Sequence, residues 1–228
     1  MEQRLQSMLG YTIHATDGEL GKVYDFFFEE AAWTIRYMVV ETGNWLSGRK
    51  VLIAPVAMGK PDWDSKTVSV NLTCEQVRNS PDIDTEMPVY PHHEVLLHDY
   101  YDWPRYWGNG YAGTFGVTPF SLFEPQDLPA AEPTETGPHL RSTRMLTGCH
   151  IHATDGEIGH VKDFIINDEN GEILSLLVDT GSWLPGTGRK VVFPVLWVKE
   201  INWDLLTANI NHSREDVELS PGYKPYEL

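Results

Sequence analysis

The stretch IHATDGELGKVYDF (Ile13–Phe26) returns later in the chain as IHATDGEIGHVKDF (Ile151–Phe164), with eleven of the fourteen positions identical. Further matches follow in the same order: TGNWL at 42–46 and TGSWL at 180–184, RKV at 49–51 and 189–191, WD at 63–64 and 203–204, and SP at 80–81 and 220–221. Agreement over this length indicates an internal duplication. It predicts one module over residues 8–83 and a second over 146–222.

Each module has the pattern of short strands joined by tight turns. An Asp-Gly pair between two apolar runs predicts a two-residue hairpin, and a glycine three positions later indicates a bulge or a close approach of two backbones. The residues that define this hairpin in the two copies are Asp17, Gly18, Gly21, Asp155, Gly156 and Gly159. Thr73-x-x-Gln76 and Ser213-x-x-Asp216 have the form of capping boxes and predict a short terminal helix in each module. About five short strands in such a module favour closure into a small β-barrel, because closure leaves few bare sheet edges.

The opening of each copy, Gly10–Phe26 and Gly148–Phe164, resembles the PRC-barrel module. This family includes the cytoplasmic domain of the photosynthetic reaction-centre H subunit and one domain of a ribosome-maturation factor. The chain also resembles stand-alone bacterial proteins with two such modules. The resemblance implies a mainly β protein made of two tandem small PRC-type β-barrels, and it implies no specific biochemical activity.

The composition limits the classes of partner. The formal net charge is −16 and 22% of the residues are charged, so the acidic surface does not favour nucleic acid or anionic membranes as partners. No apolar run approaches the roughly 20 residues of a membrane span, and we expect no membrane insertion. The two cysteines, Cys74 and Cys149, form no CxxC or metal-binding spacing, as expected for a reducing cytoplasm.

Residues 84–145 are expected to connect the two modules. A short helix is predicted over 92–101, followed by an aromatic elbow, and the Pro-, Glu- and Thr-rich part over 123–141 is expected to be a flexible linker. The aromatic side chains of the elbow either pack against a barrel or form an interface with a partner chain. Loop tryptophans at equivalent positions of the two modules are either lids over the barrel core or exposed contacts. The candidate interaction residues are therefore Trp45, Trp183, Trp103, Tyr106 and Trp107.

The residues that could carry chemistry have simpler structural interpretations. His92, His93, His98 and Asp99 are weak candidates for a metal site, because their spacing does not place two histidines one helical turn apart. His14 and His152 are interpreted as strand-end residues that form hydrogen bonds across the turn. No catalytic triad order, phosphate-binding loop or dinucleotide fingerprint is present, and we expect neither an enzyme nor a cofactor.

The sequence thus predicts a cytoplasmic, non-catalytic interaction or scaffold protein, whose partner is another protein or a second copy of the chain. Intramolecular pairing of the two barrels, as in a homodimer of single modules, is expected. Two alternatives remain: an accessory factor related to the reaction-centre H subunit, and a metal- or small-molecule-dependent enzyme.

Overall fold

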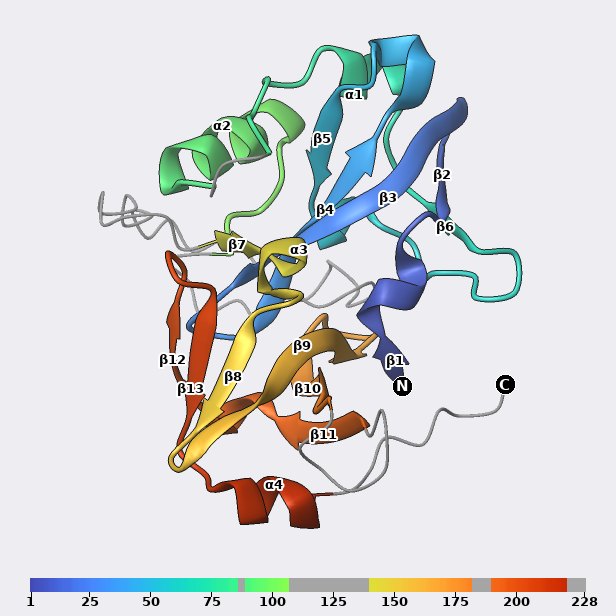
Figure 1. The fold of residues 1–228 in the computed structure, drawn as a ribbon. Coiled ribbons are helices and arrows are strands. Elements are labelled where there is room, and N and C mark those ends of the chain that lie inside the picture. Colours follow the sequence, from blue (N-terminus) through green and yellow to red (C-terminus); the bar gives the residue numbers. More distant parts are fainter. Residues whose placement is uncertain (86–88, 107–139, 182–189, 221–228) are drawn as a thin grey trace, which may run out of the picture. The chain divides into compact units, whose positions relative to one another are not determined.

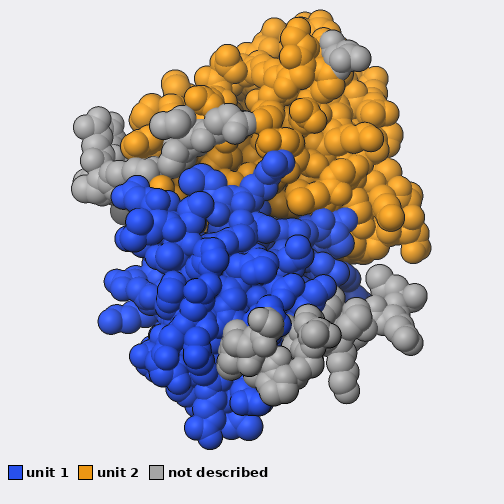
Figure 2. All heavy atoms as spheres, viewed as in Figure 1, with its two compact units in different colours: residues 1–7, 143–167, 172–228 blue, residues 8–142, 168–171 orange. Residues whose placement is uncertain are grey.

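The computed structural model describes residues 1–85, 89–106, 140–181 and 190–220, and these residues form a mainly β protein with two separate sheets (Figure 1). The chain divides into two compact units, shown in different colours in Figure 2. Unit 1 contains residues 1–7, 143–167 and 172–228, and unit 2 contains residues 8–142 and 168–171.

Unit 2 holds the first copy of the repeated sequence. Its six-stranded sheet has the order β5-β4-β3-β2-β6, and β7 is an additional partner of β3. The strands are β2 (Thr12–Ala15), β3 (Gly18–Glu29), β4 (Thr34–Glu41), β5 (Lys50–Ile53), β6 (Thr67–Ser69) and β7 (Leu140–Ser142). The helical elements are the 3-10 turns η2 (Gly43–Leu46) and η3 (Pro55–Ala57) and the α-helices α1 (Cys74–Arg78) and α2 (Pro91–Tyr101).

Unit 1 holds the second copy. Its seven-stranded sheet has the order β11-β10-β9-β8-β13-β12, and β1 is an additional partner of β9. The strands are β1 (Glu2–Arg4), β8 (His150–Ala153), β9 (Gly156–Asn167), β10 (Ile173–Asp179), β11 (Lys190–Pro194), β12 (Val198–Asn202) and β13 (Thr207–Ile210). The remaining elements are η1 (Leu5–Met8), which spans the boundary between the units, α3 (Thr143–Leu146), η5 (Val195–Trp197) and α4 (Arg214–Leu219).

The two copies have equivalent pairing at their first hairpin. In unit 2, Ile13 lies opposite Gly21, and in unit 1 Ile151 lies opposite Gly159; both registers shift at the next pair. A β-carbon on Gly21 would lie 2.1 Å from the backbone oxygen of Glu41, so the close approach expected from the sequence is present. Gly159 has the same surroundings, 2.0 Å from the oxygen of Asp179.

The hairpin turn differs from the expected type I′ Asp-Gly turn. Ala15 pairs with Gly18, so the turn lies one residue earlier than predicted, and Asp17 does not adopt a positive φ. Its carboxylate instead accepts a hydrogen bond from the backbone N–H of Cys74 at 2.8 Å, at the start of α1. Asp155 accepts the equivalent bond from Arg214 at the start of α4, at 2.9 Å. The aspartate therefore ties the hairpin to the terminal helix.

Both predicted capping boxes are confirmed. Thr73 and Gln76 exchange side-chain and backbone hydrogen bonds at the start of α1, and Ser213 and Asp216 do so at the start of α4. Such a box satisfies two of the amide groups that the first helical turn leaves without partners.

The closed barrel expected for each module is not what the described strands form, because both sheets remain open. The sheet of unit 2 ends at β5 and β6, which do not pair with each other in the described part of the chain. Pro55 ends β5 and starts a 3-10 turn, and the following segment meets β6 only through the isolated bridges of Met58 with Val70 and of Asp62 with Thr67.

The expected division into two modules and a separate connector also differs from the observed units. Of the described parts of the connector, residues 84–85, 89–106 and 140–142 belong to unit 2 with the first copy, and residues 143–145 belong to unit 1. Residues 1–7, expected outside the modules, belong to unit 1 with the second copy. Apolar burial explains the first difference: Val89, Leu97 and Leu140 of the connector join a buried cluster on the sheet of unit 2.

Candidate interaction surface and buried polar cluster

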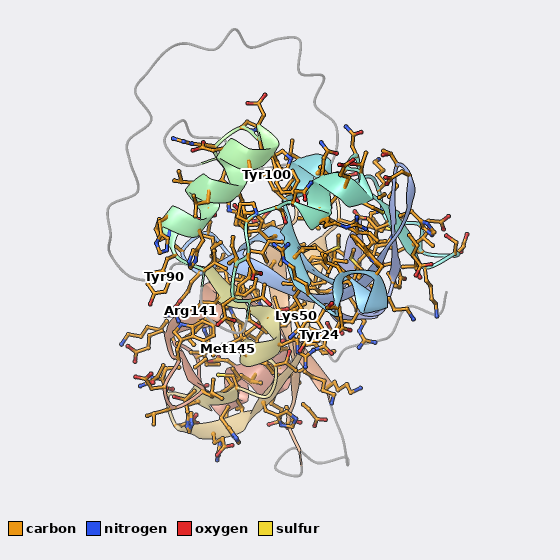
Figure 3. The ribbon with its side chains drawn as sticks, turned by 90° about the horizontal axis from the view of Figure 1, so that it is seen from above. Tyr24, Lys50, Tyr90, Tyr100, Arg141 and Met145 are labelled. Carbon is orange, nitrogen blue, oxygen red and sulfur yellow. The ribbon has the colours of Figure 1, made fainter. Side chains whose placement is uncertain are left out.

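Helix α2 covers the outer face of β3, β4 and β5 in unit 2. The strands present Phe27, Tyr37, Val39 and Leu52 on this face, and Leu97 of α2 packs against them. The opposite face of the same strands is also buried. In Figure 3, Tyr90 and Tyr100 mark the two ends of α2. The sheet therefore has apolar side chains buried on both faces in this region.

Five side chains form what we call the polar cluster, at the contact between α2 and β4. Its members are Arg36, Tyr37, Glu94, His98 and Tyr106. Tyr37, Glu94 and His98 are nearly inaccessible to solvent, at 0%, 1% and 3% exposure. Polar groups at this depth are stable only when they are hydrogen-bonded.

His98 links the helix to the sheet. Its Nε2 lies 2.8 Å from the hydroxyl of Tyr37, and its Nδ1 lies 3.3 Å from the backbone oxygen of Trp103. Because a carbonyl oxygen only accepts, Nδ1 donates to Trp103. The Tyr37 hydroxyl is hydrogen-bonded to both His98 Nε2 and the Glu94 carboxylate. Burial lowers the pKa of His98 below its usual value, which favours the neutral form of the ring.

Glu94 and Tyr106 form the second half of the polar cluster. The hydroxyl of Tyr106 donates a short hydrogen bond to the Glu94 carboxylate. The Arg36 guanidinium carbon lies 4.1 Å from the centre of the Tyr106 ring, a cation–π contact, and Arg36 Nε also donates to Glu29 at 2.8 Å. Burial, and then the nearby charge of Glu94, raise the pKa of both Tyr37 and Tyr106.

The polar cluster is thus a hydrogen-bond network that links α2 and the following turn to the sheet. Its carboxylate, guanidinium, imidazole and hydroxyl groups contact one another in a region with little access to solvent. Such an arrangement contributes stability and specificity of packing.

The residues considered for a metal site do not come together. His92 and His93 have ring centres 4.0 Å apart, but His93 is engaged in the capping box at the start of α2. His98 is buried in the polar cluster, and Asp99 is exposed and pairs with Arg105 at 2.7 Å. Across the described ranges, no three His, Cys, Asp or Glu side chains are placed to hold a metal ion.

Three of the five candidate interaction residues lie in the described ranges. Trp103 stacks on Tyr101 with ring centres 4.2 Å apart, and Tyr106 belongs to the polar cluster. Trp45 is half-buried and donates from its indole nitrogen to the backbone oxygen of Leu20 at 2.7 Å. Trp183 and Trp107 lie outside the described residues. The described aromatic side chains are therefore held by contacts within their own unit.

A pair of exposed aliphatic side chains occupies equivalent places in the two copies. Val56 in η3 is 54% exposed, and Leu196 in η5 is 85% exposed. Val56 lies in the 3-10 turn that follows β5, directly after Pro55. Leu196 lies in the 3-10 turn that follows β11, whose last residue is Pro194. We call Val56 and Leu196 the aliphatic pair.

Sequence reasoning missed three members of the polar cluster: Arg36, Tyr37 and Glu94. A signal was nevertheless present, because alignment of the two copies places Arg36 opposite Leu174 and Tyr37 opposite Ser175. A charged residue opposite an aliphatic one, and a large aromatic residue opposite a small one, indicate a contact that only the first copy makes.

At the surface of unit 2, the ammonium of Lys50 lies 4.0 Å from the centre of the Tyr24 ring, and Figure 3 shows the two side chains together. Tyr24 also packs against the buried cluster that contains Leu97 of α2. No helix in the described part of the chain has the length and apolar character needed to cross a bilayer.

Comparison with known families gives one match: the PRC-barrel domain model matches residues 144–212, which lie in the second copy. A comparison with curated proteins finds no match. The second copy therefore carries a PRC-barrel domain, as its sequence pattern predicted.

Proposed function

We propose that the chain is a non-catalytic interaction or scaffold protein built from two PRC-barrel modules. The family match covers the second module. The first module is included because it shares the motif, the hairpin register and the capped terminal helix of the second. We further propose that each open sheet forms part of the β-barrel of a PRC-barrel module.

The aliphatic pair is the observation on which this proposal depends. A single exposed leucine on a protein surface requires no explanation. Here, however, an exposed aliphatic side chain recurs at the equivalent position of both copies, in a 3-10 turn that otherwise buries Ala57 or Val195. A repeated apolar contact point fits a protein that binds partners through both modules.

The polar cluster supports the non-catalytic part of the proposal. His98, Glu94 and the two tyrosines are buried titratable groups of unit 2, and hydrogen bonds link His98 to Tyr37 and Glu94 to Tyr106. Their role in the proposal is to hold α2 in place.

The test is to compare protein capture by the full-length chain and by a variant with Val56→Ser and Leu196→Ser. Burying an aliphatic side chain contributes about 1.5–3 kcal/mol, so loss of one contact should weaken binding roughly ten- to hundred-fold. Leu205→Ser is the matched control, because Leu205 is also exposed, at 70%, but lies outside η3 and η5.

We expect specific partners to be lost from the aliphatic-pair variant and retained by the control. The identity of the captured proteins also bears on the accessory-factor alternative, which requires reaction-centre polypeptides among them. If the wild-type chain captures nothing and light scattering shows a monomer at all concentrations, the proposal is wrong.

A further inference from the structure

Each sheet contains a short strand from the segment that precedes the other copy in the sequence. In unit 1, β1 pairs antiparallel with the end of β9, with Arg4 opposite Ile165. In unit 2, β7 pairs antiparallel with the end of β3, with Ser142 opposite Phe27. Arg4 and Ser142 are equivalent when the two copies are aligned, so the two pairings have the same register.

In both units, a buried aspartate binds the segment that contains the added strand, β1 or β7. Asp163 of β9 is 0% exposed, and its carboxylate accepts from Arg4 Nε at 2.7 Å and from the backbone N–H of Gln6 at 3.0 Å. Asp25, its equivalent in β3, is 4% exposed and accepts from the Ser142 hydroxyl at 2.5 Å. A buried carboxylate is costly without such partners.

The segment has further contacts within unit 1. Leu5 is buried at 1% exposure, and Gln6 donates from its side chain to Thr147 at 2.9 Å. Glu2 is exposed, and the Arg4 side chain remains 42% exposed. Opening this three-residue strand would leave the buried Asp163 without its Arg4 and Gln6 partners, so the site is stable only when a strand with the same groups fills it.

We propose that the end of β9 and Asp163 form a strand-binding site with an exchangeable occupant. Residues 2–6 fill this site within one chain, and the same residues of a second copy fill it when two chains meet. The chemistry is the same in both cases: antiparallel backbone pairing, an arginine for the buried carboxylate and a leucine for the adjacent apolar position. Exchange of an identical element between copies adds no new interface chemistry, which makes it a low-cost route to a dimer.

This inference is independent of the aliphatic pair, and its test uses full-length chains. Glu2 and Asn167 are register partners in the β1–β9 pair and lie at the solvent-accessible end of the strand. One chain carries Glu2→Cys, and the other carries Asn167→Cys. The two chains are mixed in an oxidising glutathione buffer over a range of concentrations, and covalent heterodimer is measured on non-reducing gels.

A double variant with Glu2→Cys and Asn167→Cys in one chain shows whether the strand occupies its site, because it should form an intramolecular disulfide. The matched control for the mixture replaces the acceptor chain by Lys162→Cys, an exposed β9 position that does not pair with β1. Both acceptor chains retain Cys74 and Cys149, so the control also measures disulfides formed by the native thiols.

We expect the Glu2→Cys and Asn167→Cys chains to give several times more heterodimer than the control, in proportion to concentration. Adding Arg4→Glu to the Glu2→Cys chain should lower the yield to the control level, because a second carboxylate would face Asp163. An intramolecular disulfide in the double variant together with only control-level heterodimer would overturn the exchange. Absence of the intramolecular disulfide would overturn the strand-binding site itself.

Discussion

Replacing Tyr37 by phenylalanine removes the hydroxyl through which β4 is hydrogen-bonded to His98 and Glu94 of α2. The ring of Tyr37 stays in place in the variant, so the apolar burial on both sides of β4 is unchanged. What is lost is the hydroxyl that lies 2.8 Å from His98 Nε2. Because His98 is only 3% exposed, water cannot replace this partner without opening the contact between α2 and the sheet.

The expected cost follows from leaving a buried acceptor without a donor, which is about 1–3 kcal/mol. With a urea dependence of about 1–3 kcal/mol per molar, a loss of about 2 kcal/mol moves the unfolding midpoint of unit 2 down by roughly 1 M. The assay is urea unfolding of the full chain, followed by near-ultraviolet circular dichroism.

Tyr100→Phe provides the matched control. Tyr100 lies on the same helix and its hydroxyl donates to the backbone oxygen of Gln76 at 2.8 Å, but its side chain is 39% exposed. Water can take over the Gln76 oxygen, so we expect the free energy of unfolding to change by less than about 0.5 kcal/mol. If Tyr37→Phe costs no more than Tyr100→Phe, the polar cluster does not hold α2 in the way described.

Three further predictions concern the pH dependence of stability, the close backbone approach at Gly21 and Gly159, and Trp45. The folded-state pKa of His98 lies below its unfolded value of about 6.5, so its contribution to stability is complete above that pH. As the pH falls from there toward the folded pKa, this contribution is lost by up to about 1.4 kcal/mol per pH unit. The decrease in the free energy of unfolding between about pH 7.5 and 5.5 should therefore be smaller in His98→Gln than in the wild type. Gly21→Ala and Gly159→Ala should each cost more than about 3 kcal/mol in urea unfolding, because the new methyl group would lie about 2 Å from a backbone oxygen. Trp45→Phe should cost about 0.5–1.5 kcal/mol in the same assay through loss of its bond to the Leu20 oxygen, and an unchanged midpoint would argue against that bond.

The strands, the capped helices and the close backbone approaches at the repeated glycines could be predicted from the sequence because their signals are local. Thr73 and Gln76 are three residues apart, and a capping box needs nothing beyond that spacing. Gly21 lies in a repeated motif, and its need for a positive φ is a property of one residue. The hydrogen bond of Asp17 could not be predicted from local sequence, because its partner is the backbone of Cys74, 57 residues away.

The polar cluster and the added strands could not be predicted in the same way. His98 and Tyr37 are 61 residues apart, and each by itself is an ordinary residue of a helix or a strand. Residues 2–4 have the sequence Glu-Gln-Arg, which carries no apolar alternation and no β-branched side chain. Their strand exists because the end of β9 offers backbone partners and Asp163 offers a charge, and both are properties of the folded unit.

The pairing of β1 with β9 has a consequence for the order of synthesis. Arg4 and Asp163 are separated by 159 residues, so β1 has no strand to pair with until β9 has been synthesised. At about 5–20 residues per second, this delay is roughly ten to thirty seconds. During that time the first copy can fold, and β1 completes the sheet of the second copy only after β9 has been made.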